Sequence, residues 1–239
     1  MTNNPKTGLS GEELRKRLRN SFGLRISRQS VPLYESVWMP KLYAPKNSPN
    51  NERLAFLGEN ILHSVLATYL YEKFPCNDPL LLEDLRDRIV HHARLSRMAH
   101  RLQIEYRADT ANEDALLLRD YINSDIVKAL IGAVTLTKGY KHAEKLILTQ
   151  LRQQEQTIKE IGANNPNYKG KVMAWGQRNK AEIRFKLTKE VKYNGKNLHV
   201  VSLYINNEWV ANGCDLLVKN AEQHASLNAL DTLSIQNDF

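Results

Sequence analysis

The chain has 239 residues, with 34 Lys and Arg residues against 26 Asp and Glu residues and a formal net charge of +8. Its hydrophobic content of 42% and charged content of 25% exclude disordered and fibrous chains, and no apolar run is long enough to predict a membrane span. Two cysteines are too few for a disulfide framework and favour a reducing compartment.

The pattern up to residue 160 is helical. Three prolines make residues 40–50 a predicted loop. Apolar residues then recur with a period of about 3.6 residues over 51–74, which predicts a helix ended by Pro75. Three further helices are predicted, over residues 80–102, 121–137 and 140–161. Gly139 is expected to cap the helix over residues 121–137.

The pattern changes after residues 161–167, a stretch rich in Asn with one Gly and one Pro that predicts a linker between two domains. Alternation over residues 181–187 predicts a half-buried strand with Ile183, Phe185 and Leu187 facing inward. The remaining predicted elements are a helix over 169–179, strands over 198–205 and 208–211, a tight turn at Asn206-Asn207, and a helix over 217–234.

The predicted fold is an all-helical domain followed by a small α+β domain. The limits are residues 1–160 for the helical domain, 161–167 for the linker and 168–236 for the second domain. The α-β-β-β-α order of the second domain resembles that of a double-stranded RNA-binding domain.

The positive charge is concentrated in two blocks. Residues 1–50 have a net charge of +6 and residues 151–200 of +7, whereas residues 51–150 and 201–239 have −1 and −4. Clustered cations are typical of a protein that binds a polyanion, because each phosphate contact releases condensed counterions. A solvated basic surface without a partner would give the same pattern, so charge alone leaves both interpretations open.

Three segments resemble a known family. Residues 51–59, NERLAFLGE, resemble the NERLEFLGD motif of the ribonuclease III family at seven of nine positions. Residues 125–133, DIVKALIGA, resemble the family's DxxEALIGA, and residues 168–179 resemble the first helix of its double-stranded RNA-binding domain. The resemblance covers most of the chain, from about residue 13 to about residue 233. It implies an all-helical ribonuclease III-type domain followed by an RNA-binding domain.

The resemblance also implies a chemistry. Members of the family cleave duplex RNA with Mg²⁺ held by four carboxylates. Two of them are four residues apart on one helix, and the other two are three residues apart on another. These spacings place each pair on one helix face, and hard Mg²⁺ prefers oxygen ligands. Carried over residue by residue, the four positions are Ala55, Glu59, Asp125 and Lys128.

The sequence departs from the family at this site. Ala55 and Lys128 replace carboxylates, Glu59 replaces an aspartate, and Asp125 matches, so the formal charge of the four positions changes from −4 to −1. Lys128 is expected to pair with Asp125 and to compete with a metal ion.

Glu59 and Asp125 are therefore the remnant catalytic and metal-binding positions, which we expect to bind a metal weakly or not at all. No cofactor is expected, and Mg²⁺ only if the protein is active. The alternative is that Glu59, Asp125 and Glu52 still hold one metal ion and support residual cleavage.

The standard RNA contacts of the family's second domain are reduced in this chain. Only Lys219 remains of a lysine pair at the start of the last helix, and Met173 and Ala174 replace polar residues of the first. Residues 169–196 nevertheless contain nine basic and two acidic side chains, which predicts a relocated phosphate-binding face, with a solvated surface as the alternative. The predicted RNA-binding residues are Lys169, Lys171, Arg178, Lys180, Arg184, Lys186, Lys196 and Lys219.

Phe56 matches a residue that packs across the homodimer interface in members of the family. The resemblance therefore implies a homodimer, or a heterodimer with a ribonuclease III paralogue. The alternative is that Phe56 belongs to the core of one chain.

The leading hypothesis is a catalytically inactive ribonuclease III-like protein that binds double-stranded or structured RNA. Its role would be in RNA processing or in ribonucleoprotein structure, with ribosome association as one form. The alternatives are an active Mg²⁺-dependent ribonuclease III that cleaves duplex RNA, including ribosomal RNA, and a non-catalytic partner of an active paralogue. The bacterial-type domain order favours the cytoplasm, with the mitochondrion as the alternative, and no membrane partner is expected.

Overall fold

The computed structural model describes residues 11–74, 79–106, 117–153, 167–193 and 195–232. The chain forms two compact units: the first contains residues 1–107 and 119–164, and the second contains residues 108–118 and 165–239. All of the predicted linker except Asn167 lies outside the described residues, as does Pro75. The predicted domain limits therefore stay a prediction.

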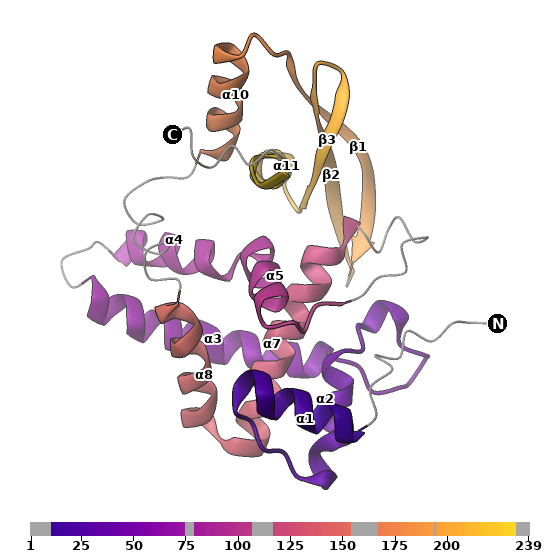
Figure 1. The fold of residues 1–239 in the computed structure, drawn as a ribbon, viewed down its shortest axis with the longest axis vertical. Coiled ribbons are helices and arrows are strands. Elements are labelled where there is room, and N and C mark those ends of the chain that lie inside the picture. Colours follow the sequence, from indigo (N-terminus) through magenta and orange to yellow (C-terminus); the bar gives the residue numbers. More distant parts are fainter. Residues whose placement is uncertain (1–10, 75–78, 107–116, 154–166, 194, 233–239) are drawn as a thin grey trace. The chain divides into compact units, whose positions relative to one another are not determined.

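The first unit is helical (Figure 1). Its α-helices are α1 (Gly11–Phe22), α2 (Val31–Val37), α3 (Glu52–Lys73), α4 (Pro79–Val90), α5 (His92–Arg101), α7 (Arg119–Lys138) and α8 (Tyr140–Arg152), with 3-10 turns η1 (Arg28–Ser30) and η2 (Lys41–Tyr43). Among the described residues, no helix has both the length and the apolar content needed to cross a membrane.

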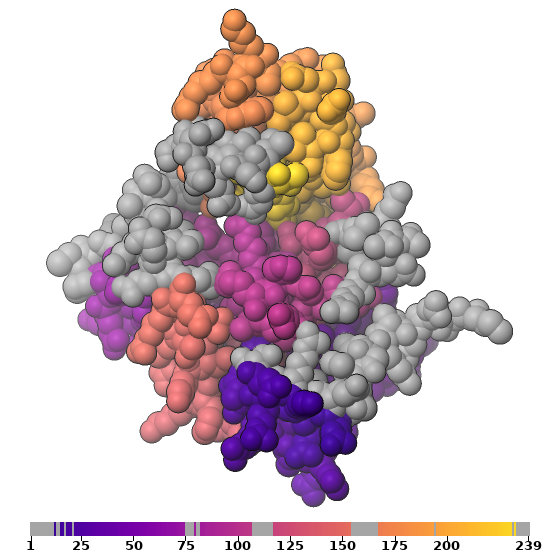
Figure 2. Space-filling model, in the orientation of Figure 1, coloured from indigo at the N-terminus to yellow at the C-terminus, as the bar shows by residue number. Residues whose placement is uncertain are grey.

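Helix α7 is the centre of this unit. It packs against α2, α3, α5 and α8, and most of its middle is buried because apolar and small residues occupy all of its faces. The space-filling view shows α1, α5 and α8 on the surface of the unit (Figure 2). The helices around α7 therefore bury its middle, so the side chains in that part of the helix have fixed positions.

One predicted helix is divided into two in the structure. The single helix predicted over 80–102 is two helices, α4 and α5, separated at His91, whose backbone is extended (φ −55°, ψ 137°). Helix α4 packs on α3, whereas α5 packs on α7, so the break lets the two segments contact different partners. An apolar pattern that continues through one extended residue does not reveal such a break.

The other predicted helices of this unit are confirmed where the structure describes them. Gly139 has a φ of 86°, and its N–H donates to the carbonyl oxygen of Thr135 at 3.0 Å, as expected of a helix cap. Helix α8 begins at Tyr140 as predicted, but residues 154–161 lie outside the described residues.

The second unit has the predicted α-β-β-β-α order, so the predicted fold class is confirmed. Its elements are α10 (Tyr168–Arg178), β1 (Ile183–Tyr193), β2 (Lys196–Ile205), β3 (Glu208–Asp215) and α11 (Val218–Thr232). The strands form one antiparallel sheet in the order β1-β2-β3. Asn206 and Asn207 both have positive φ values, 51° and 67°, which matches a two-residue hairpin turn.

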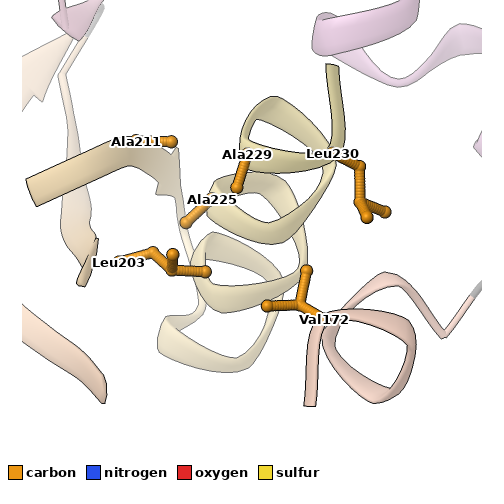
Figure 3. Close-up of a cluster of buried hydrophobic side chains, with 6 residues drawn as sticks. All are labelled: Val172, Leu203, Ala211, Ala225, Ala229 and Leu230. Atoms are coloured by element: carbon orange, nitrogen blue, oxygen red, sulfur yellow. The ribbon is translucent and has the colours of Figure 1, made fainter. Parts of the chain in front are cut away.

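The helices of the second unit cover one face of the sheet (Figure 3). A Cβ at Gly213 would lie 2.0 Å from the carbonyl oxygen of Ala221, so only glycine allows α11 to approach β3 this closely. The core cluster draws residues from α10, β2, β3 and α11, namely Val172, Leu203, Ala211, Ala225, Ala229 and Leu230.

Leu187 was predicted to face this core, but it is 49% exposed. The pairing of β1 with β2 shifts between Leu187 and Lys189, because Thr188 is an extra residue in the ladder. This bulge ends the simple alternation that correctly places Ile183 and Phe185 against the core.

Candidate functional site

Two glycines bring α3 and α7 into close contact. A Cβ at Gly58 would lie 1.7 Å from the carbonyl oxygen of Lys128, and a Cβ at Gly132 would lie 2.2 Å from that of Leu54. Neither position has room for a larger residue unless the helices separate. The two helices that carry the four family positions therefore cross in backbone contact.

This crossing joins Glu59 to Lys128. The Nζ of Lys128 donates a hydrogen bond to Oε1 of Glu59 at 2.7 Å, and the side chains are 15% exposed for Lys128 and 46% for Glu59. The pairing of Lys128 with Asp125 stays a prediction, whereas the bond to Glu59 reaches across to the other helix. Charged hydrogen bonds that are shielded from water are stronger than those on an open surface.

The other two family positions lie one helical turn away on the same two helices. Ala55 is 7% exposed and offers only a methyl group. Asp125 is half-buried and precedes Lys128 by three residues on α7. In the described part of the chain, neither Glu59 nor Asp125 belongs to a group of three His, Cys, Asp or Glu side chains close enough to share a metal ion.

The donor set does not fit Mg²⁺ held in the family manner. Mg²⁺ requires several oxygen ligands in nearly octahedral geometry. Here one position is a methyl group, one is an ammonium, and the Oε1 atom of Glu59 already accepts from that ammonium. Glu52, considered as a substitute ligand, is instead paired with Lys41 at 2.7 Å.

His63 lies one turn after Glu59 on α3. Burial lowers the pKa of His63, and the positive charge of Arg86 on α4 acts in the same direction. The charges of Glu59 and Asp87 oppose this shift, and that of Lys128 adds to it. His63 is therefore electrostatically coupled to the Glu59–Lys128 pair, a proximity that only the folded chain reveals.

Phe56 is on the surface of the first unit, with an exposed fraction of 72%. The alternative that Phe56 belongs to the core of one chain is thus wrong. Tyr71, about four turns further along α3, is 73% exposed, and both belong to a stripe of exposed residues that includes Asn60, Ser64 and Ala67. One exposed stripe of α3 therefore has an aromatic residue near each end.

In the second unit, Lys169 is engaged within the fold. Its Nζ donates to Oε2 of Glu222 at 2.6 Å and lies 5.0 Å from the centre of the Phe185 ring. These contacts join α10 to α11 and to β1. Lys169 therefore stabilises the helix layer, and its role as an RNA contact stays a prediction.

The remaining predicted RNA-binding residues are exposed, but they do not form one face. On β1, Arg184 and Lys186 alternate with the core residue Phe185, so they lie on the sheet face away from the helices. The others are Lys171, Arg178 and Lys180 in and after α10, Lys196 at the start of β2, and Lys219 in the first turn of α11.

Comparisons with known proteins agree with this architecture. The profile of the ribonuclease-III-like family matches residues 33–154, which include both helices of the candidate site. Ribonuclease 3 of Azobacteroides pseudotrichonymphae is 29% identical over 203 residues, covering 83% of this chain and 77% of that protein. Ribonuclease 3 of Leptospira interrogans is 28% identical over 232 residues, covering 93% of this chain and 90% of that protein.

A solved structure is similar to the first unit. The nuclease domain of ribonuclease III from Campylobacter jejuni, described for structural flexibility in a region involved in dimer formation, is 28% identical to this chain. It superposes with a TM-score of 0.51 and covers 58% of this chain and 96% of that domain. From its sequence profile, its fold and these relatives, the chain belongs to the ribonuclease-III-like family.

Proposed function

We propose that this protein binds double-stranded or structured RNA and does not cleave it. The observation that carries this proposal is the ion pair between Lys128 and Glu59 at the crossing of α3 and α7. It places a fixed ammonium among the positions where cleavage by the family requires metal-binding oxygens. A site built in this way holds its own positive charge in place of a metal ion.

A metal ion at this site would compete with Lys128 for the carboxylate of Glu59. A metal ion would have to displace the ammonium of Lys128 from Glu59 and would then find no oxygen at Ala55. Loss of ligands removes the means of activating water and of stabilising the leaving oxygen, so we expect cleavage to fall by several powers of ten.

Binding of RNA is supported by the second unit. Its α-β-β-β-α order is that of domains that read the A-form shape of duplex RNA through contacts to phosphates and 2′-hydroxyls. Lys171, Lys196 and Lys219 are exposed on different elements and are candidates for phosphate contacts. With about five phosphate contacts, the slope of log affinity against log salt should be close to −4.

A dimer is the second part of the proposal. Phe56 is exposed on the helix that carries the family motif, and the Campylobacter jejuni domain is described as having a region involved in dimer formation. A homodimer would make an RNA-binding scaffold in RNA processing or in a ribonucleoprotein such as the ribosome. A mixed dimer with an active paralogue would instead supply one competent site. From the bacterial-type domain order we place this function in the cytoplasm.

The experiment incubates the purified protein with long duplex RNA and either Mg²⁺ or Mn²⁺, and measures cleavage and binding together. We expect duplex binding without metal-dependent cleavage. The double variant Ala55→Glu with Lys128→Glu restores the four acidic positions, and we expect its melting temperature to rise with added Mg²⁺. Lys138→Glu, an exposed lysine at the end of the same helix, is the matched control and should gain no such dependence.

Robust cleavage by the native protein that Asp125→Ala abolishes would show the protein to be an active ribonuclease. Nicking of one strand, seen only after an active paralogue is added, would support the mixed dimer.

A further inference from the structure

The sheet of the second unit has an aromatic row on the face away from the helices. Tyr204 pairs with Arg184 on one side and with Trp209 on the other, so the three residues lie side by side across β1, β2 and β3. Adjacent strands are about 5 Å apart, which makes the row roughly 10 Å long. Leu203 and Ala211, on the opposite face, belong to the core. Trp209 does not follow Ala211 onto that face, because the pairing of β2 with β3 shifts between them and Val210, which packs against the core, is the extra residue.

The tryptophan of this row is exposed and held in position. Trp209 is 59% exposed, although an indole ring is among the side chains that most favour burial. Its Nε1 donates to Oδ1 of Asn212 at 2.9 Å, and the same oxygen accepts from the hydroxyl of Ser202 at 2.7 Å. The ring is thus anchored through its edge to the sheet, so little conformational entropy would be lost if a ligand stacked on it.

The charge beside the row is suited to an anionic partner. Lys186, the next residue of β1 on this face, is exposed and forms no ion pair with the residues that the structure describes. Arg184 reaches Glu182 at 2.9 Å, but both side chains are more than half exposed, and such surface pairs exchange readily with another anion. Aromatic faces next to cations are the arrangement that binds bases and phosphates together.

We propose that the row Arg184–Tyr204–Trp209, together with Lys186, binds unpaired nucleotides of RNA. Trp209 and Tyr204 would stack on bases, and Arg184 and Lys186 would contact the adjoining phosphates. A duplex does not meet these requirements, because its bases are stacked on one another and their faces are hidden. The partner is therefore a single-stranded segment, such as a loop or an overhang.

This site is separate from the proposed duplex-binding surface. Lys219 and Lys171 are on the helices that cover one face of the sheet, and the aromatic row is on the other face. The same second unit could then contact a helical stem through one surface and an adjoining single strand through the other. The two activities are expected to respond to different substitutions.

The test measures binding of the full-length protein to a labelled single-stranded oligouridine of about ten nucleotides, and separately to duplex RNA. Stacking should quench tryptophan emission from Trp209, since Trp38 is only 4% exposed and Trp175 is packed against the core of the second unit. We expect Trp209→Ala to weaken oligouridine binding about tenfold and to remove the quenching, with duplex affinity unchanged.

Two further variants make the result specific. Lys186→Glu reverses a charge without changing the ring and should also weaken oligouridine binding. Leu187→Ala removes an exposed apolar side chain next to Lys186 on β1, but from the other face, since Leu187 pairs with Val201, and it should have no effect.

Native oligouridine affinity in both Trp209→Ala and Lys186→Glu would overturn the proposal. So would complete displacement of oligouridine by duplex RNA that depends on Lys219. If Trp209→Ala changes the oligomeric state but not RNA binding, the face is a protein contact and the proposal is wrong. Failure of duplex binding alone would instead count against the proposed function and leave this inference standing.

Discussion

Lys128 on α7 donates from Nζ to Oε1 of Glu59 on α3 at 2.7 Å, across the point where Gly58 and Gly132 bring the two helices into contact. This bond joins two of the four positions at which relatives of the chain are expected to hold carboxylates. An internal ion pair therefore stands where the resemblance to the family implies a metal ion.

The first prediction concerns the strength of this pair. In a double-mutant cycle of Lys128→Met and Glu59→Gln, the free energy of unfolding should show a coupling of about 1 kcal/mol, because one partner is largely shielded from water. Denaturant unfolding of the four proteins measures this value. A coupling near zero would mean that the pair makes no net contribution to stability.

The second prediction concerns the helix crossing. Gly58→Ala should lower the free energy of unfolding by about 3 kcal/mol or more, since its Cβ would lie 1.7 Å from a backbone oxygen. Gly139→Ala is the control: its Cβ would meet no atom within 4 Å, so only the positive φ of 86° is strained, at a cost of about 1 kcal/mol. Equal losses in both variants would contradict close contact at Gly58.

The third prediction is a dependence of stability on pH. The pKa of His63 is lowered in the folded state by burial and by Arg86, so the unfolded chain binds its proton more readily. This histidine therefore destabilises the fold as pH falls below its usual pKa of about 6.5, and has no effect well above that value. In melting experiments between about pH 7 and pH 5, His63→Gln should lose less stability than the native chain. Thr68→Ala, a substitution on the same helix without a titrating group, should behave like the native chain.

The fourth prediction separates two lysines of the second unit. Lys169→Met should lower the free energy of unfolding by about 1 kcal/mol, because it removes the bond to Glu222 and the contact with the ring of Phe185. Lys219→Met, at an exposed position, should leave stability unchanged and weaken duplex RNA binding with a smaller salt slope. The opposite assignment of the two effects would identify Lys169, and not Lys219, as the RNA contact.

The fifth prediction concerns oligomeric state. Phe56→Glu should convert a dimer to a monomer in sedimentation experiments, since it places a charge in the centre of the proposed interface. The control is Leu136→Glu, another exposed apolar residue of the first unit, at the end of α7. A native protein that is already monomeric at high concentration would remove the basis for this interface.

Local pattern was enough to identify most elements of the fold. The helical period over α3, the two asparagines of the hairpin and the glycine after α7 depend on neighbours in sequence, and each is found as predicted. The break at His91 and the bulge at Thr188 were missed, because each depends on which surface the following segment packs against. The predicted phosphate-binding face stays a prediction, but its residues are divided between the two sides of the sheet for a related reason. Arg184 and Lys186 alternate with a core residue that fixes them on the far side of the sheet from the helices.

The sequence by itself determined which side chains stand at the four family positions. A methyl group at Ala55 and an ammonium at Lys128 have the same chemistry in any conformation, and they decide that two of the four carboxylates are lacking. Only the tertiary structure decided what those side chains contact. Lys128 bonds to Glu59, 69 residues away, and Trp209 stands beside Tyr204 on the sheet face away from the helices. The physical reason is that a hydrogen bond or a stacked ring depends on distances of a few ångströms between atoms. In this chain those distances are set by the close crossing of α3 and α7 and by the register of three strands.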